Sequence, residues 1–248
     1  EIINDDTIEY VDIVTPIKTH TRTLLKFIHN KKKILVEKPL LLNIKEEKII
    51  SKYIKNTKGN IIVSYPYKYS QTLSYAKKIY KQKKFGGFQY IEIVLQQCGR
   101  FLDYDVNTLL GPHAISIISK FQDLKKIKFE NFNIIMDESK TETSLILCKI
   151  NKKIIGKIDL SLNYSNKNSI KLIKIFCEKG TIKCDLNSGV NTLESYMFKK
   201  KEDKAIMKKE IFKFFDETNN MRYVIKDFIK NSKKIQKNNY ELTLKINN

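Results

Sequence analysis

The sequence has little arginine. Only three of its 47 basic residues are arginine, and the rest are lysine. A formal net charge of +20 would by itself favour a nucleic-acid partner. Recognition of phosphates and base edges, however, usually employs the planar fork of arginine, and the lysines here are scattered in short groups along the chain. We therefore expect a solvated, lysine-rich surface and no specific nucleic-acid partner.

Metal-binding patterns are also missing from the sequence. The four cysteines, Cys98, Cys148, Cys177 and Cys184, form no C-x-x-C motif, and no histidine stands at zinc-ligand spacing. No metal site is predicted, and free thiols in a reducing compartment are expected. The cysteine pattern therefore favours a cytoplasmic location.

Long apolar runs are absent as well. No run approaches the ~18–20 residues that a membrane span requires, so no membrane partner is expected. No signal peptide is visible in the sequence, which begins at Glu1. A hydrophobic fraction of 42% nevertheless supports a packed core, and 248 residues suffice for one large domain or two small ones.

The first 64 residues alternate between strand-like and helix-like segments. The expected elements are a strand over 10–15, a helix over 18–30, a strand over 33–36, a helix over 44–56 and a strand over 61–64. The second helix is expected to turn Ile49, Ile50, Tyr53 and Ile54 inward. The order β-α-β-α-β predicts a parallel sheet with right-handed crossovers.

The segment Ile34-Leu35-Val36-Glu37-Lys38-Pro39 organises this first part of the chain. Its apolar residues are typical of a short buried strand, which ends where Pro39 can no longer donate a ladder hydrogen bond. Glu37 and Lys38 therefore lie at the carboxyl end of a parallel strand, where open α/β sheets bind ligands. A lysine that is desolvated there has a lowered pKa suited to proton transfer near neutrality.

After Ser64 the pattern changes to an α+β one. Helices are expected over 71–82, 113–121 and 217–235, a polar loop over 98–108, and a further helix could begin within 239–248. Strands are expected over 88–97, 127–135, 143–150, 153–162, 170–177, 181–185 and 190–198. The last full helix is expected to turn inward Met221, Val224, Ile225, Phe228 and Ile229. The spacing predicts a large, mainly antiparallel open sheet, with a domain boundary between 64 and 65.

Six motifs occur in an order and spacing that resemble one known family. They are Asp12-Ile13-Val14-Thr15-Pro16 with His20, the run from Lys33 to Pro39, the run from Ile61 to Tyr69 that ends in Lys68-Tyr69, Gly86-Gly87, Gly111-Pro112-His113, and Glu178-Lys179-Gly180-Thr181. The set is similar to the motifs of the Gfo/Idh/MocA family of NAD(P)-dependent oxidoreductases, and it extends over nearly the whole chain. Glu-Lys-Pro alone would be a weak signal, whereas the ordered set is specific.

The resemblance implies a fold and an activity. The fold is α/β: residues 1–64 would be the C-terminal part of a Rossmann-like dinucleotide-binding domain, and residues 65–248 an α+β domain for substrate binding and oligomerisation. The reaction would be hydride transfer between NAD or NADP and a secondary alcohol or carbonyl of a sugar, cyclitol or sugar derivative. Subunit contacts through the open sheet would give a homodimer or homotetramer.

The resemblance also implies roles for residues of the first domain. Lys38 would be catalytic, binding the reacting hydroxyl or carbonyl and assisting proton transfer, and it would also contact the cofactor. Glu37 would lie near the nicotinamide ribose, whereas Thr15, Pro16 and His20 would line the cofactor cleft. The alternatives are an ordinary salt-bridging acid for Glu37, and turn and helix-start residues for the other three.

Two residues of the second domain receive roles in the same way. His113 would contact the substrate and share proton transfer with Lys38, since imidazole can act as acid or base near neutrality. Lys68 would contact the cofactor or a phosphate of the substrate. The alternatives are a structural histidine at a helix start and an ordinary surface lysine.

The sequence departs from the family in two respects. It contains no G-x-G-x-x-G, the turn that places a pyrophosphate at a helix N-terminus, so the chain is expected to lack the N-terminal half of the nucleotide-binding domain. Many members carry an aspartate four residues before the histidine, where this sequence has Leu109. A non-catalytic ligand-binding or regulatory protein on the same fold, or an inactive fragment, is therefore the alternative.

Overall fold

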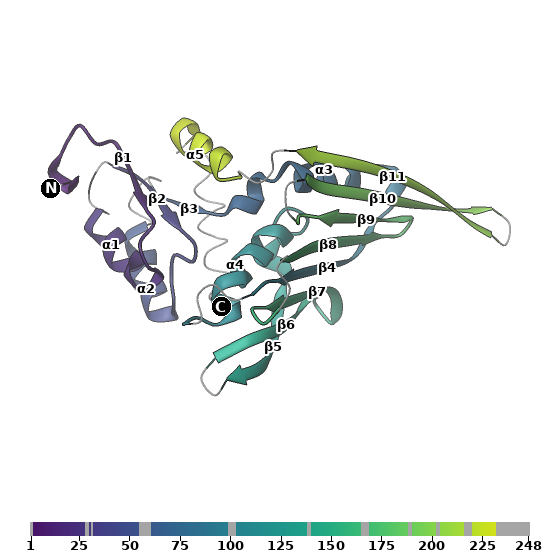
Figure 1. The fold of residues 1–248 in the computed structure, drawn as a ribbon, viewed down its shortest axis with the longest axis horizontal. Helices are drawn as coiled ribbons and strands as arrows, with labels where there is room; N and C mark the ends of the chain where they lie inside the picture. Colours follow the sequence, from purple (N-terminus) through teal and green to yellow (C-terminus); the bar gives the residue numbers. More distant parts are fainter. Residues whose placement is uncertain are drawn as a thin grey trace. The chain divides into compact units, whose positions relative to one another are not determined.

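The chain forms two compact units in a computed structural model (Figure 1). Unit 1 comprises Glu1–Pro66 and Asn220–Asn248, and unit 2 comprises Tyr67–Asn219. The structure describes residues 2–27, 30, 32–54, 61–98, 103–137, 140–164, 169–187, 190–201, 204–215 and 220–231. The boundary after Pro66 lies close to the expected one, but the C-terminal segment belongs to unit 1, which differs from the domain 65–248 expected from the sequence.

Unit 1 contains a three-stranded parallel sheet in the order β1-β2-β3. Its elements are β1 (Tyr10–Ile13), α1 (His20–Phe27), β2 (Lys33–Glu37), α2 (Ile44–Ile54), β3 (Ile61–Ser64) and α5 (Asn220–Asn231), with short 3₁₀ turns at Ile2–Asn4 and Ile17–Thr19. All four residues of β3 and the middle three of β2 are buried, as expected for strands covered on both faces. The predicted parallel α/β arrangement is confirmed.

The inward face of α2 differs from the prediction. Ile50 is fully buried, whereas Ile49 is 45% exposed. Successive residues of a helix lie about 100° apart, so one of two adjacent isoleucines turns to solvent unless the apolar face is wide. The side chains of Tyr53 and Ile54 lie outside the described residues.

The helix α5 returns the chain to unit 1. It packs on β3, where the Ser64 hydroxyl donates to the Met221 sulfur at 3.4 Å, and the Phe228 ring meets Tyr10 edge-on at a centroid distance of 5.6 Å. Val224 and Phe228 are buried as predicted, but Ile225 and Ile229 are exposed. The placement of this helix in the second domain was wrong because periodicity identifies an apolar face and not the surface that it covers. The expected helix within 239–248 lies outside the described residues.

Unit 2 is built on an eight-stranded sheet in the order β11-β10-β9-β8-β4-β7-β6-β5. The pair β4–β7 is parallel and the other neighbouring pairs are antiparallel, so the predicted mainly antiparallel sheet is confirmed. The strands are β4 (Phe88–Gln96), β5 (Lys128–Asp137), β6 (Lys140–Ile150), β7 (Lys153–Ser161), β8 (Ile170–Cys177), β9 (Gly180–Asp185), β10 (Val190–Lys201) and β11 (Lys204–Phe215).

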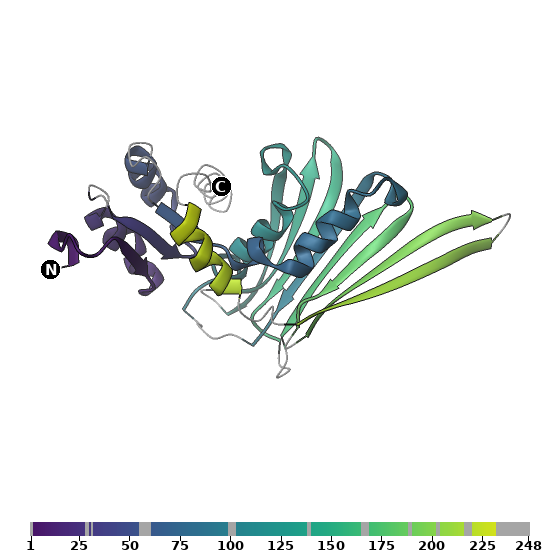
Figure 2. The same cartoon turned by 90° about the horizontal axis from the view of Figure 1, so that it is seen from above.

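Two helices cover one face of this sheet (Figure 2). The helix α3 (Gln71–Tyr80) packs over β9 and β10, and α4 (Val106–Ile118) packs over β4, β6 and β7. The core beneath them is a row of fully buried side chains paired from strand to strand: Ile158, Ile93, Ile173, Cys184 and Leu193. Short 3₁₀ turns lie at Pro66–Tyr69 (η3), Lys83–Phe85 and Leu124–Lys126.

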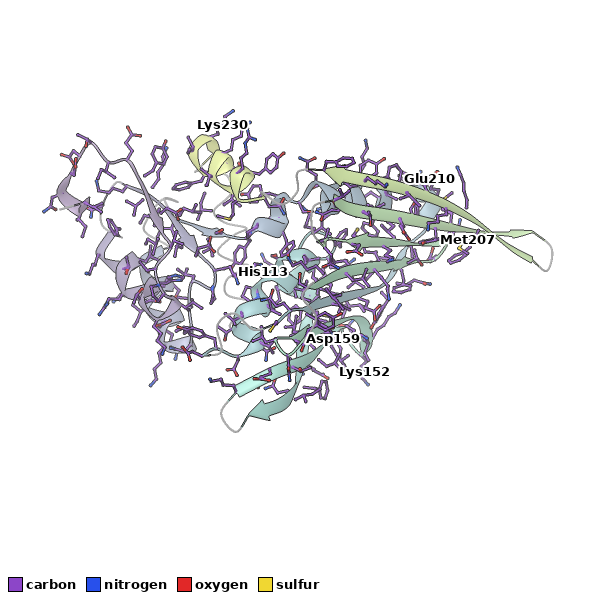
Figure 3. All side chains as sticks on the ribbon, in the orientation of Figure 1. His113, Lys152, Asp159, Met207, Glu210 and Lys230 are labelled. Carbon is purple, nitrogen blue, oxygen red and sulfur yellow. The ribbon has the colours of Figure 1, made fainter. Side chains whose placement is uncertain are left out.

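The strand β11 was not predicted. It pairs along its whole length with β10, which extends three residues past the expected end of that strand (Figure 1). Figure 3 labels Met207 and Glu210 on β11. Four lysines in its twelve residues obscure the alternation of apolar side chains. Edge strands often carry lysine, which discourages pairing with other chains, and β11 lies at the edge of the sheet.

The helix α4 begins earlier than expected. The sequence predicted a loop over 98–108 and a helix from His113, whereas α4 runs through Gly111-Pro112 from Val106. Ten of its thirteen residues are buried, and this packing outweighs the helix-breaking tendency of the Gly-Pro pair. His113 therefore lies in the middle of a helix. Residues 99–102 of the expected loop lie outside the described residues.

Two glycine motifs noted in the sequence pack against each other. The Glu178 carboxylate accepts a hydrogen bond from the Gly87 amide at 2.8 Å, and the Glu178 amide donates to the Gly87 carbonyl oxygen at 3.0 Å. Gly86 has a φ of 74°, a left-handed conformation that favours glycine. At Gly180, an added Cβ would lie 2.3 Å from the carbonyl oxygen of Tyr196 and 3.0 Å from the Phe85 ring. These contacts explain the glycines at both turns.

Substitution Gly180→Ala is expected to lower the free energy of unfolding by about 2–3 kcal/mol, because the new methyl group meets backbone that cannot yield. Chemical denaturation of both proteins measures the difference. Gly111→Ala is the matched control: nothing lies within 4 Å of its added Cβ, and alanine is favoured in a helix by up to about 1 kcal/mol. Equal stability of Gly180→Ala and the wild type would contradict the close approach seen here.

Two further features concern the length of the helices and the state of the cysteines. None of the helices in the described ranges is long and apolar enough to cross a membrane. All four cysteines are free thiols, with Cys98 exposed and the other three buried.

Candidate active site

The Glu-Lys-Pro turn follows β2 directly. Leu40 and Leu41, just beyond it, are buried, so the chain continues into the core of unit 1. The Lys38–Pro39 peptide bond is cis, and the Lys38 amide donates to the Glu37 carboxylate at 3.3 Å. Lys38 is half-buried, and burial lowers its pKa to about 8, while the Glu37 carboxylate opposes this by favouring the ammonium form. This amine can therefore gain or lose a proton close to neutral pH.

The turn after β1 lies beside this segment, because β1 and β2 are parallel neighbours with Ile13 opposite Val36. Thr15 and Pro16 are exposed there. The Thr19 hydroxyl lies 2.7 Å from the Thr15 hydroxyl and 2.7 Å from the Pro16 carbonyl oxygen, which fixes the turn locally. Two of the residues predicted to contact a cofactor are thus accessible at the carboxyl edge of the sheet.

His20, the third residue predicted for the cofactor cleft, is 1% exposed. Its Nδ1 lies 2.9 Å from the Pro39 carbonyl oxygen, and its Nε2 lies 2.7 Å from the Thr15 carbonyl oxygen. The ring therefore spans the two turns at this edge of the sheet. The structure brings Thr15, His20 and the Lys38-Pro39 turn together within unit 1.

In unit 2, Lys68 lies on η3, the turn that precedes α3. Lys68 is half-buried, and burial lowers its pKa to about 8. The Lys120 ammonium donates to the Lys68 carbonyl oxygen at 2.5 Å and to the Ser74 hydroxyl at 3.1 Å, so it ties η3 to α3. Sequence reasoning did not find Lys120, because only the fold brings it to this turn.

His113 lies on α4 (Figure 3). Its ring meets the Tyr67 ring edge-on, with centroids 5.1 Å apart and an interplanar angle of 85°. Burial raises the pKa of Tyr67 to about 12, so its phenol remains protonated near neutrality. Sequence reasoning missed Tyr67, although it directly precedes Lys68 in one of the family-like motifs. The structure thus brings His113 and the Lys68 turn together within unit 2.

No carboxylate stands one turn before His113. Leu109 occupies that position and is 7% exposed. Asp105, a nearby carboxylate in the sequence, accepts a hydrogen bond from the Thr141 amide at 2.8 Å and so holds the start of α4 against β6. Among the described residues, no group of three or more His, Cys, Asp and Glu side chains is placed to hold a metal ion.

Unit 1 is therefore a parallel α/β unit with a lysine turn at its carboxyl edge, and unit 2 is a mostly antiparallel sheet with helices on one face. Residues 1–65 match the family model GFO_IDH_MocA, described as the oxidoreductase family with the NAD-binding Rossmann fold.

A curated relative supports the same assignment for part of the chain. The chain is 44% identical over 57 residues to the NAD(+)-dependent scyllo-inositol 2-dehydrogenase of Bacillus subtilis strain 168. That match covers 23% of this chain and 17% of the length of the relative.

Solved structures match over almost the whole chain. Levoglucosan dehydrogenase in complex with NADH and levoglucosan has a TM-score of 0.77 at 14% identity, covering 99% of this chain and 78% of that one. Myo-inositol dehydrogenase from Corynebacterium glutamicum has a TM-score of 0.72 at 15% identity, covering 98% and 76%. UDP-N-acetylglucosamine 3-dehydrogenase from Acidithiobacillus ferrooxidans has a TM-score of 0.75 at 16% identity, covering 96% and 75%. At such identities the likeness establishes the fold.

The resemblance to the Gfo/Idh/MocA oxidoreductases expected from the sequence is therefore confirmed by the family model for residues 1–65. Over the rest of the chain, the solved structures show the same fold. The family is one of NAD(P)-dependent dehydrogenases and oxidoreductases, which agrees with the expected class of enzyme and cofactor.

Proposed function

We propose that the protein is an NAD(P)-dependent dehydrogenase or reductase that acts on a secondary alcohol or carbonyl of a sugar, cyclitol or sugar derivative. The observation that carries the proposal is Lys38: a half-buried amine with a pKa lowered to about 8, at the carboxyl end of a parallel strand, inside the segment that matches an NAD-binding family model. The named relatives act on cyclitols and sugars, which supports this class of substrate.

The residues at the carboxyl edge of unit 1 fit the nicotinamide end of the cofactor. Exposed Thr15 and Pro16 would contact it at the end of β1, and Glu37 and Lys38 would contact it at the end of β2. When bound, NAD(P) supplies the group that accepts or donates the hydride. The sequence contains no G-x-G-x-x-G turn, and no residues are proposed for the pyrophosphate.

The protein's own part in the reaction is proton transfer and orientation. In the oxidation direction, the neutral Lys38 amine accepts the proton of the reacting hydroxyl, and in the reduction direction the ammonium returns a proton to the carbonyl oxygen. His113 binds a substrate oxygen and shares this proton transfer. Lys68 binds a substrate hydroxyl or phosphate, since its desolvated amine gains from an anionic or polar ligand.

The open face of the eight-stranded sheet is the proposed subunit interface in a homodimer or homotetramer. On β11, the apolar side chains of Met207, Ile211 and Phe215, which are four residues apart, are exposed, whereas Phe212 and Phe214 pack on Tyr75 of α3. The molar mass in solution tests this assembly. The proposed location of the protein is the cytoplasm.

A turnover screen tests the proposed function. The purified protein is incubated with NAD or NADP and a panel of cyclitols, hexoses and nucleotide sugars, and the absorbance of reduced nicotinamide is followed. Turnover that depends on one cofactor and one group of related substrates is the expected result. No turnover on any member of the panel, despite measurable binding of the cofactor, would count against it.

Leu109 favours a second candidate, a non-catalytic ligand-binding or regulatory protein on the same fold. The buried side chain of Leu109 has no group that could hydrogen-bond a substrate or the His113 ring. Such a protein would bind a sugar or cyclitol in a calorimetric titration without any change in cofactor absorbance. An inactive fragment would show neither response.

A further inference from the structure

We propose that His20 is a positioning residue that fastens the Lys38-Pro39 turn to the turn after β1, and that it does not itself contact the cofactor. The inference rests on the proposed function, because it concerns how the proton-transferring lysine is placed. It also revises the role that the family resemblance implies for His20.

The geometry of the ring supports this role. His20 is the first residue of α1, and its ring is buried at the edge where β1 and β2 end. Nδ1 faces the Pro39 carbonyl oxygen at 2.9 Å, and Nε2 faces the Thr15 carbonyl oxygen at 2.7 Å. Both ring nitrogens are therefore directed at backbone of the protein.

The chemistry of these contacts makes them costly to lose. Carbonyl oxygens only accept, so a neutral ring makes one hydrogen bond in either tautomer, and a ring protonated on both nitrogens makes two. Because the ring is 1% exposed, water has little access to replace it. A buried carbonyl oxygen without a hydrogen-bond donor raises the free energy of the folded protein, so the turn would rearrange until the oxygen meets another donor.

The Pro39 carbonyl oxygen is one residue away from Lys38. On the other side, the Lys38 amide donates to the Glu37 carboxylate. The backbone of the lysine is thus held from both directions, and its side chain starts from a fixed point. If the His20 contact is lost, the turn gains freedom and water reaches the amine. The pKa of Lys38, which burial now lowers to about 8, would then rise toward its ordinary value.

Three substitutions separate the two contacts. His20→Ala removes both, His20→Asn places an amide nitrogen near the position of Nδ1, and His20→Gln places one near the position of Nε2. For His20→Ala we expect kcat to fall by roughly tenfold to a hundredfold, as misplacement of a catalytic group by about 1 Å does. The dissociation constant of the cofactor should be unchanged, and the pH at which the oxidation rate rises should move upward. His20→Asn should recover more activity than His20→Gln, because it keeps the contact beside Lys38.

Thr21→Val is the matched control. Thr21 is the next residue of α1 and is also buried. Its hydroxyl makes a long contact of 3.5 Å with the carbonyl oxygen of Leu40, and not with that of Pro39. The control should keep the kcat and the pH profile of the wild type. Circular dichroism shows whether each variant folds. If His20→Ala does not fold, the comparison of His20→Asn with His20→Gln tests the positioning role.

Two kinetic or binding results would overturn the proposal. A loss of cofactor affinity in all three His20 variants, with the pH profile unmoved, would place His20 in contact with the cofactor. An unchanged kcat and pH profile in His20→Ala would remove any positioning role. If the wild type shows no turnover, the proposed function fails instead. Nuclear magnetic resonance then tests the contact directly, through a scalar coupling between a His20 ring nitrogen and the Pro39 carbonyl carbon, and its absence would overturn the inference.

Discussion

Replacement of Lys38 by methionine is expected to reduce kcat near neutral pH by roughly 10³-fold, since general acid–base groups contribute about 10²–10⁴-fold. Methionine keeps an unbranched apolar stem in the half-buried site and removes the amine. The fold of unit 1 should survive, because the stem packs where the lysine stem did. Steady-state kinetics with the preferred cofactor and substrate measures the loss, and a cofactor titration separates it from weaker binding.

The pH profile of the wild type gives an independent test of the same residue. Burial lowers the pKa of Lys38 from its usual 10.5 to about 8. Oxidation needs the neutral amine, so its rate should increase as the pH rises through about 8 and then level off. Reduction needs the ammonium, so its rate should decrease over the same range. In Lys38→Met this dependence should disappear in both directions.

Lys45→Met serves as the control for the change in charge. Lys45 lies exposed on α2, outside the proposed site, and its loss should leave kcat and the pH profile as in the wild type. Wild-type kcat in Lys38→Met would show that another group transfers the proton, and the proposed mechanism would then be wrong.

Substitution His113→Phe is expected to lower kcat/KM by roughly 10²-fold, because it removes both ring nitrogens from a group proposed to bind substrate and share proton transfer. Phenylalanine preserves the edge-on aromatic contact with Tyr67, which keeps the packing of the ring. Kinetics on the preferred substrate measures the effect, and the melting temperature reports whether α4 is disturbed.

The control for this second prediction is Ser119→Ala at the end of the same helix. Its hydroxyl donates to the Ser116 carbonyl oxygen, so the substitution changes α4 without touching the proposed substrate site. A His113→Phe protein with wild-type kcat/KM would assign His113 to packing alone. Together with Leu109, that outcome would favour the non-catalytic candidate.

Local signals in the sequence were sufficient to predict an element where a strand, its end and its neighbours lie close together in the chain. The apolar run before Glu37, ended by Pro39, predicted β2 and the position of Lys38, and the structure confirms β2 and shows the burial of the lysine. The start of α4 was missed because Gly111-Pro112 breaks most helices, and only its burial in unit 2 outweighs that tendency.

The features that the sequence did not predict depend on contacts between residues far apart in the chain. The position of α5 in unit 1 depends on β3 and Tyr10, which are more than 150 residues earlier in the sequence. The same is true of the candidate site. Thr15 and Lys38 were identified from motifs, whereas the contacts of His20 with Pro39 and of Tyr67 with His113 exist only once the fold has formed.

The return of α5 to unit 1 has a consequence for synthesis on the ribosome. The strands of unit 1 emerge early, but the helix that packs on β3 follows only after the whole of unit 2 has been translated. At typical rates of about 5–20 residues per second, that interval is roughly 8–30 s. The nascent chain therefore completes its second unit before its first, and during that time the surface formed by Tyr10 and β3 remains available to a chaperone.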